Sequence, residues 1–311
     1  MKQTLRVHNA AIHYFDMVRR CGSIREAARR LNVASSAVSR QIIKLEDEIQ
    51  APLFERLPSG LRLTTAGEIF ARHVMVVMQD TERTRSELGA LRGLRSGHVR
   101  LAIVEGLISD LMPTVIERMR ERYPNISTDI AILGSQQIPE ALAKGQADLG
   151  VAFSLKRHAD LRQLAIAHFE LGAIMRPDHP LARHTELNLV TCSQYPMILP
   201  TPELSLYQLV APLFSGQERP TNGVARVSSV ELAKQMAKRG VGIAFQTRIG
   251  ILEELEKETL AFVPVRLGGP IYSDLGVYAR NGRFLPVAAD AYARALNEEI
   301  IARGQGDRRQ W

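Results

Sequence analysis

The 311-residue sequence predicts an α/β protein with an all-α N-terminal region, a long connecting helix and a C-terminal part made of two α/β lobes. Three observations predict this arrangement. Apolar residues recur at helical spacing up to about residue 91, short apolar runs alternate with helical patterns from residue 99 onward, and charge is divided unevenly between these parts. Residues 1–97 carry 16 basic and 10 acidic side chains, whereas residues 98–311 carry 24 and 23. This asymmetry is typical of a polyanion-binding module joined to a near-neutral body, and leaves open nucleic acid, an acidic protein or a membrane surface as partner.

Composition excludes several classes of protein. A hydrophobic content of 45% suffices for a core in each of two or three domains. No apolar run approaches the ~18 residues that span a bilayer, and no apolar segment follows the N-terminus as in a secretory signal. The two cysteines, Cys21 and Cys192, lie far apart and match neither a disulfide scaffold nor a zinc module. We therefore expect no membrane association, no metal, no cofactor, and a location in the reducing cytoplasm.

Three short helices are predicted at the N-terminus. The first runs from Val7 to Arg20 and stops at Gly22. Ser23 and Glu26 then form a capping box that opens a second helix with small alanines on its buried face. After a turn over residues 32–34, Ser35 or Ser36 caps a third helix. Its apolar stripe consists of Val38, Ile42, Leu45 and Ile49.

The third helix carries short polar groups and cations opposite its apolar stripe. Such side chains read base edges and phosphates when a helix enters a major groove N-terminus first, although they could also form a solvated face. A turn at Pro58, Ser59 and Gly60 predicts either a β-wing that presses cations against the nucleic-acid backbone or a plain hairpin. The candidate DNA-binding residues are Ser35, Ser36, Ser39, Arg40, Gln41, Lys44, Arg56 and Arg62.

The motifs of this region resemble those of a known family. The stretch from Ala27 to Ile42, followed by Leu45-Glu46, residues 53–56 and residues 63–67, is similar to the winged helix-turn-helix of LysR-type transcriptional regulators. The resemblance implies a DNA-binding domain over residues 1–64. Three residues depart from the family pattern: Ala34 and Ser35 stand where the family usually has a hydroxyl cap followed by Gln or Pro, and Ser59 replaces a wing arginine.

A connecting helix is predicted from Ala66 to Leu91, within a linker over residues 65–95, with Thr65 and Glu68 as its capping box. Its inner positions alternate by four and three residues, which predicts a two-helix seam, unless the helix packs against its own domain. The resemblance implies pairing of two DNA-binding domains on an operator dyad, in a homodimer or homotetramer. Gly93, Ser96 and Gly97 predict a hinge. The predicted seam comprises Phe70, Val74, Val77, Thr81, Thr84, Leu88 and Leu91.

The C-terminal part reads as two βαβ units over residues 99–153 and 197–245, followed by a strand at 275–279 and a helix at 287–303 that returns to the first lobe. It resembles the LysR-type effector domain, with two lobes like those of periplasmic binding proteins. The motifs Ile138–Val151, Pro177–Leu181 and Gly240–Ala244 carry this resemblance. We expect the domain to span residues 96–303 and to end in a disordered tail over residues 304–311.

In open α/β sheets a ligand sits beyond the carboxyl ends of the strands, near helix N-termini. We expect Ser135 and Thr201 to be the main effector contacts, although each hydroxyl could equally be a helix cap. Because Glu105 would repel an anion unless it is paired, the effector could be an amino-containing or mixed-charge molecule as well as a carboxylate. The candidate effector contacts are Glu105, Gly106, Leu107, Ser135, Gln136, Thr201, Ser228, Ser229, Phe245 and Gln246.

The common short motifs of catalysis are absent: the sequence has no GxSxG, Walker A, GxGxxG or HExxH motif, and its eight histidines show no metal-ligand spacing. A solute-binding receptor and an enzyme fused to a DNA-binding segment are the rival hypotheses. The sequence favours a ligand-responsive, DNA-binding transcription factor that is not an enzyme and that acts with RNA polymerase.

Overall fold

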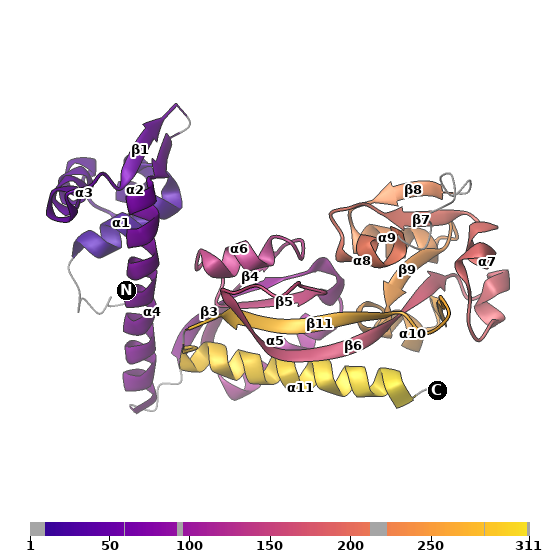
Figure 1. Ribbon diagram of the computed structural model, residues 1–311. Helices are drawn as coiled ribbons and strands as arrows, with labels where there is room; N and C mark the ends of the chain where they lie inside the picture. Colours follow the sequence, from indigo (N-terminus) through magenta and orange to yellow (C-terminus); the bar gives the residue numbers. More distant parts are fainter. Residues whose placement is uncertain (1–9, 59, 92–95, 212–222, 283, 310–311) are drawn as a thin grey trace. The chain divides into compact units, whose positions relative to one another are not determined.

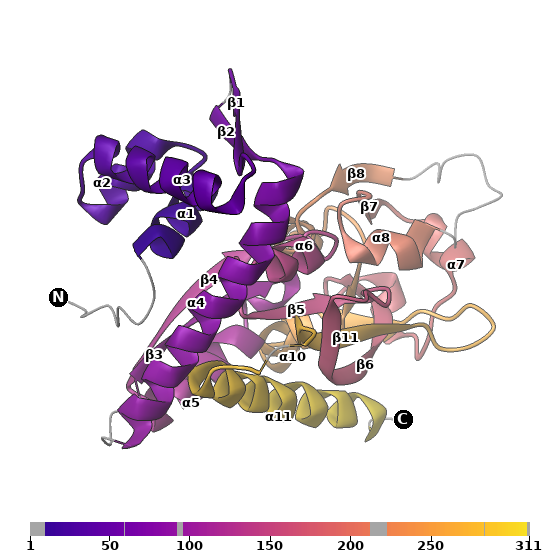
Figure 2. The same cartoon turned by 60° about the vertical axis from the view of Figure 1, so that its left-hand side comes forward.

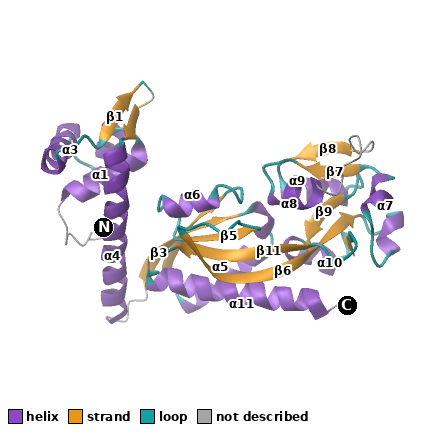
Figure 3. Cartoon of the chain, viewed as in Figure 1, coloured by secondary structure: helices purple, strands orange, loops and turns teal. Residues whose placement is uncertain are grey.

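A computed structural model of the chain describes residues 10–309 except 59, 92–95, 212–222 and 283 (Figure 1). Contacts divide the chain into two compact units, Met1–Gly93 and Leu94–Trp311. The first unit contains helices and a hairpin, and the second contains mixed sheet and helix (Figure 3).

The N-terminal unit gathers three helices beside a two-stranded antiparallel hairpin that leads into a long helix (Figure 2). The start of the predicted first helix at Val7 lies outside the described residues. Gly22 takes a φ of +62°, which ends the first helix because L-residues with a side chain disfavour this conformation. The elements are α1 (Ala10–Cys21), α2 (Ile24–Leu31), α3 (Ser35–Ile49), β1 (Phe54–Leu57), β2 (Gly60–Leu63) and α4 (Thr65–Leu91).

Aromatic rings and one close backbone approach hold this unit together. Phe15 of α1 is fully buried, with its ring centroid 5.2 Å from that of Phe54 and 4.9 Å from that of Phe70. The carboxylate of Glu46 on α3 accepts the N–H groups of Leu53, at 2.7 Å, and of Phe54. A Cβ at Gly67 would lie 2.0 Å from the Leu53 carbonyl oxygen, so only glycine lets α4 start this close to the hairpin.

The start of α2 follows the predicted capping box only in part. The Ser23 hydroxyl accepts a hydrogen bond from the Glu26 N–H at 3.4 Å. The Glu26 carboxylate does not return that bond, because it accepts hydrogen bonds from Arg29 and Arg30 on the same helix.

Two other helix starts differ from the prediction by one residue. α3 begins at Ser35, so its N-cap is Ala34, which has no side-chain acceptor; the predicted serine cap at 35 or 36 is wrong. α4 is capped by Thr64, whose hydroxyl accepts the Gly67 N–H at 3.0 Å, rather than by Thr65. In both cases the residue predicted as the cap, Ser35 or Thr65, is instead the first residue of the helix.

The predicted seam along α4 is wrong at Val74, which is fully buried in the N-terminal core and cannot also contact another chain. Phe70 is partly buried and packs against the same core. Leu88 is 46% exposed, which is expected of a residue that would be covered only by a second chain. Ile69 and Val76 are exposed seven residues apart and present a neighbouring apolar stripe.

The C-terminal unit contains a seven-stranded sheet that spans both lobes. In the first lobe, β3 pairs in parallel with β4 and β5, as the βαβ pattern predicts. α5 and α11 cover one face of this sheet and α6 covers the other (Figures 1 and 3). Ser96 and Gly97 lie in β3 rather than in the predicted hinge, and Gly93 lies outside the described residues. The elements of this lobe are β3 (Ser96–Ile103), η1 (Glu105–Leu107), α5 (Leu111–Arg122), β4 (Asn125–Ile132), α6 (Ile138–Ala143), β5 (Leu149–Phe153), β11 (Tyr272–Arg280) and α11 (Val287–Arg309).

A fifteen-residue strand, β6 (Leu161–Met175), connects the lobes and was not predicted. Its first part pairs antiparallel with β11, and its last part pairs with β10 and β9 of the second lobe. The sheet is therefore mixed rather than parallel throughout. The second lobe contains η2 (Pro180–Arg183), α7 (Leu189–Ser193), β7 (Met197–Pro200), α8 (Ser205–Val210), β8 (Gly223–Val227), α9 (Val230–Lys238), β9 (Ala244–Thr247), η4 (Arg248–Gly250), α10 (Leu252–Glu256) and β10 (Ala261–Pro264), with β7 and β8 parallel.

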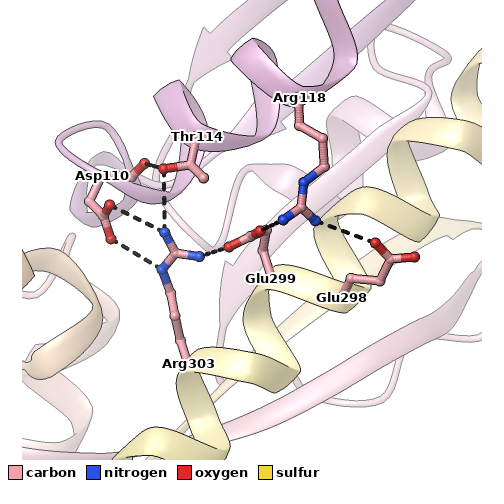
Figure 4. Close-up of polar contacts among 6 residues, drawn as sticks. All are labelled: Asp110, Thr114, Arg118, Glu298, Glu299 and Arg303. Carbon is pink, nitrogen blue, oxygen red and sulfur yellow. Dashed lines mark hydrogen bonds and ion pairs between the residues drawn. The ribbon is translucent and has the colours of Figure 1, made fainter. Parts of the chain in front are cut away.

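The last helix returns to the first lobe, as predicted, but continues to Arg309, so the expected disordered tail over residues 304–311 is wrong for its described part. Figure 4 shows the ion-pair network that fastens this helix to α5. Arg303 contacts both carboxylate oxygens of Asp110, at 3.1 and 3.2 Å, and also pairs with Glu299, which pairs in turn with Arg118. The Arg303 side chain is only 14% exposed.

Replacing Arg303 with methionine should lower the free energy of unfolding by about 2 kcal/mol, because two shielded carboxylates lose a charged partner. Urea unfolding of the full chain followed by circular dichroism measures this change. Arg294→Met is the matched control: Arg294 pairs with Asp290 on the same helix, but its side chain is 70% exposed. This control should change stability by about 0.5 kcal/mol or less. Equal losses in the two variants would contradict a structural role for the network.

Candidate functional site

A cavity of ≈ 590 Å³ lies between the two lobes of the C-terminal unit. Its walls come from the segments that follow β3, β4, β7 and β8, together with residues of β5, β9 and β11. This is the edge of the sheets where carboxyl ends of parallel strands meet, as the βαβ pattern predicts.

Most predicted contacts line this cavity and three do not. Leu107 is fully buried in the core of the first lobe. Phe245 is 3% exposed in the core of the second lobe, because alternate side chains of β9 point to opposite faces and Gln246 faces the cavity. The Thr201 N–H bonds the Val227 carbonyl at 3.0 Å, and Thr201 does not line the wall. The predicted residues in the wall are Glu105, Gly106, Ser135, Gln136, Ser228, Ser229 and Gln246.

Several lining residues were missed. Glu203 lies in the turn just beyond Thr201, and Ser205 begins α8, so this segment was located correctly but the wrong residue of it was chosen. Thr247 and Ser273 come from β9 and β11; one predicted strand ended too early, at Phe245, and the other began too late, at Leu275. The remaining missed residues form most of the apolar surface of the wall or flank it: Val104, Ile132, Leu133, Gly134, Gln137, Phe153, Leu204, Leu206 and Val230.

Ser135 carries an unsatisfied polar group in this wall. The residue is 2% exposed, and its hydroxyl finds no hydrogen-bond partner among the described residues. A buried hydroxyl without a partner costs about 1–3 kcal/mol, so such groups often mark a place where another molecule binds.

Glu105 joins the lobes at the edge of the cavity. One carboxylate oxygen accepts the Ser229 hydroxyl at 2.7 Å, and the other accepts the Val230 N–H at 2.7 Å, at the start of α9. The prediction allowed for an unpaired acid that repels anions. The structure instead pairs this acid with the N-terminus of a helix, where negative charge is stabilised.

A second contact between the lobes involves the buried amine of Lys234 on α9. It donates to the Ser109 hydroxyl at 3.0 Å and pairs with Glu231 and Glu254. Burial by itself lowers the pKa of Lys234, but the hydrogen bonds to the two carboxylates outweigh burial, and the pKa is raised. Since the folded-state pKa lies above the ordinary value, this amine stabilises the fold at neutral pH, and the contribution is lost only as pH rises through that raised pKa.

The candidate DNA contacts lie on α3 and the hairpin. Side chains of Ser35, Ser36, Arg40 and Lys44 are exposed, and those of Ser39 and Gln41 are half-buried. These six residues avoid the buried stripe of Val38, Ile42 and Leu45. On the hairpin, Arg56 and Arg62 are both exposed, and Arg62 pairs with Glu55 of the opposite strand at 2.6 Å.

Two further cations near the start of α3 were missed. Arg25 and Arg29 line an open hollow of ≈ 510 Å³ that reaches Ala34 and Ser35. The sequence of this segment predicted only the start of the second helix, and its arginines were not among the expected DNA contacts. Hydrogen bonds from Arg29 and Arg30 lower the pKa of Glu26 to about 2, so this carboxylate stays ionised beside the cations.

Metal binding, membrane spanning and thiol chemistry find little support in the described residues. They contain no group of three or more residues able to hold a metal ion, and no described helix is long and apolar enough to cross a membrane. Burial raises the pKa of the Cys192 thiol to about 12, which makes it unreactive near neutral pH.

Family models match both units: the bacterial regulatory helix-turn-helix model of the lysR family over residues 10–68, and the LysR substrate-binding domain over residues 92–300. The chain belongs to the LysR family. This LysR-family chain is therefore a DNA-binding transcriptional regulator with an effector-binding domain, and its relatives are regulators rather than enzymes.

Individual relatives agree with the family assignment. The HTH-type transcriptional activator CmpR of Synechocystis sp. is 27% identical over 306 residues, 96% of this chain and 99% of CmpR. Full-length OxyR from Pseudomonas aeruginosa has a similar fold, with a TM-score of 0.74 at 17% identity over 93% of this chain and 95% of OxyR. Full-length CbnR in complex with its target DNA gives a TM-score of 0.57 at 18% identity over 93% of this chain and 98% of CbnR.

Ser135→Ala should raise the free energy of unfolding of the ligand-free regulator by about 1 kcal/mol, because it removes a buried hydroxyl that has no partner. Ser229→Ala is the comparison and should lower it by about 1 kcal/mol, since the Ser229 hydroxyl caps α9 and bonds Glu105. Urea unfolding of both variants measures the two changes. A loss of stability in Ser135→Ala comparable to that in Ser229→Ala would show that the Ser135 hydroxyl has a structural partner.

Proposed function

We propose that this LysR-family regulator places α3 in the major groove of an operator and presses the hairpin against the neighbouring backbone. The observation that carries this proposal is the division of α3 into a buried apolar stripe and an exposed polar face near its start. Arg40 and Gln41 supply the donors that recognise base edges, and the serines suit phosphate or base contacts. Lys44, Arg56 and Arg62 supply charge for the backbone.

The start of α3 supports a phosphate contact. Because Ala34 provides no side-chain acceptor, the first-turn N–H groups of α3 are not satisfied by a cap. Arg25 and Arg29 border the same hollow. A phosphate of the DNA backbone would satisfy those amides and meet Arg25, whereas Arg29 already pairs with Glu26 in the same hollow.

Two copies of the chain would grip the two halves of an operator dyad. The exposed apolar residues of α4, Ile69, Val76 and Leu88, support a homodimer formed through this helix, which could pair further into a tetramer. DNA binding implies action in the cytoplasm, with RNA polymerase as the partner whose access to the promoter is controlled.

The second part of the proposal is that a small effector enters the cavity between the lobes. Apolar residues supply most of its wall, and the unsatisfied Ser135 hydroxyl, with Gln136, Ser228 and Gln246, supplies polar groups. Effector binding would change the closure of the lobes and so the spacing or angle of the paired DNA-binding units. Retention of a specific duplex that changes when a metabolite is added tests the whole proposal.

Arg40→Ala should weaken operator binding by about 1–3 kcal/mol if Arg40 reads a guanine edge, with loss of discrimination against other sequences. If Arg40 holds a phosphate, all sequences should weaken alike. Electrophoretic mobility shifts at several salt concentrations separate these results, and Ser39→Ala should cost less. Unchanged operator binding in both folded variants would mean that α3 is not the reading helix.

Leu88→Glu should shift the oligomer toward monomer, because it places two like charges in a seam between chains. Operator affinity should fall as well, since two half-sites would then be bound independently. Analytical ultracentrifugation measures the mass. Leu267→Glu alters a leucine that is 65% exposed in a loop of the effector domain and should leave the mass unchanged. An unaltered oligomer in Leu88→Glu would assign the dimer contact to another surface.

A further inference from the structure

The carboxylate of Glu105 lies where an external anion would bind at the N-terminus of α9. This helix has nine residues, and its first residue, Val230, lines the cavity together with Ser228 and Ser229. Each oxygen of Glu105 accepts one hydrogen bond of 2.7 Å, from the Ser229 hydroxyl and the Val230 N–H. A hydroxyl and a first-turn amide are the donors with which helix N-termini hold carboxylates and phosphates.

The direction of each hydrogen bond at this contact follows from the donors and acceptors that are present. The Ser229 oxygen accepts the Leu232 N–H at 3.0 Å, so its own hydrogen is available for Glu105. A hydroxyl has a single hydrogen to donate, and here that hydrogen is used. The Ser229 hydroxyl therefore has no hydrogen left to donate to a ligand carboxylate.

The charged residues of the cavity wall also disfavour a ligand carboxylate. No lysine, arginine or histidine is among the described residues that line it, whereas two acids, Glu105 and Glu203, are. An anion entering this cavity would meet two carboxylates and no cation, and burial of a charge without a partner is costly. Uncharged hydroxyl or amide groups of a ligand can instead form hydrogen bonds with the side chains of Ser135 and Gln136.

We propose that Glu105 supplies, from within the chain, the anion that the N-terminus of α9 would otherwise take from a ligand, and that the effector therefore carries no negative charge. This inference rests on the proposed effector cavity and names the chemical class of its occupant: a small polar molecule with hydroxyl or amide groups. Because Glu105 belongs to the first lobe and α9 to the second, the internal anion also ties the lobes together.

Chemical rescue tests the proposal on the full chain. Glu105→Ala removes the methylene and carboxylate that together correspond to acetate. The variant should melt at a lower temperature than the wild type, and acetate should raise its melting temperature progressively with concentration, relative to chloride at the same ionic strength. The wild type should show no acetate-specific rise, because its anion position is filled.

Two controls keep the result interpretable. Glu203→Ala removes the other acid of the wall and should show no acetate-specific rise. Glu105→Gln retains an acceptor of nearly the same shape, should fold even if the alanine variant does not, and should melt below the wild type without responding to acetate.

The outcomes separate this inference from the proposed function. An acetate-specific rise in Glu105→Ala alone supports the inference. No rise in Glu105→Ala, a rise of equal size in the wild type, or a Glu105→Gln variant as stable as the wild type would overturn it. None of these readouts involves DNA, so a failure of operator binding would count against the proposed function and leave this test unaffected.

Discussion

The antiparallel pairing of β6 with β11 is the constraint on which the C-terminal unit depends. β6 bonds β11 in the first lobe and then continues to bond β10 and β9 in the second. One continuous strand thus belongs to both lobes, so they are parts of a single hydrogen-bonded structure. The cavity exists because this shared strand holds the strand ends of the two lobes close to each other.

The parts of the fold that were predictable are those whose signal lies in neighbouring residues. The βαβ units and α9 follow from local apolar periodicity, and the structure has them at nearly the predicted positions. β6 gave no such signal, because its residues change from alternating to continuous burial where the strand passes between lobes. Its partner β11 lies far along the chain, and pairing between distant segments leaves no pattern in a single sequence.

The same distinction applies to the cavity. The sequence located the ends of the strands, and therefore the region in which Ser135 and Ser229 lie. It could not decide which residue of the segment after β7 faces inward, which is why Thr201 was chosen instead of Glu203 or Ser205. Nor could it show that the acid at 105 meets a helix start in the other lobe, a contact that exists only in three dimensions. In the N-terminal unit, Phe70 and Val74 fitted a heptad seam equally well and were assigned to it, although packing against Phe15 takes precedence.

The segment after β3 makes contacts with two helices, α9 and α11, within six residues. Glu105 bonds the start of α9, Ser109 bonds the Lys234 amine further along the same helix, and Asp110 holds Arg303 of α11. One end of this short segment is bonded to the second lobe, and its other end is bonded to the last helix. A movement of α9 would therefore act on this segment through two bonds. It would be passed as strain to α5 and α11, on the far side of the sheet from α6.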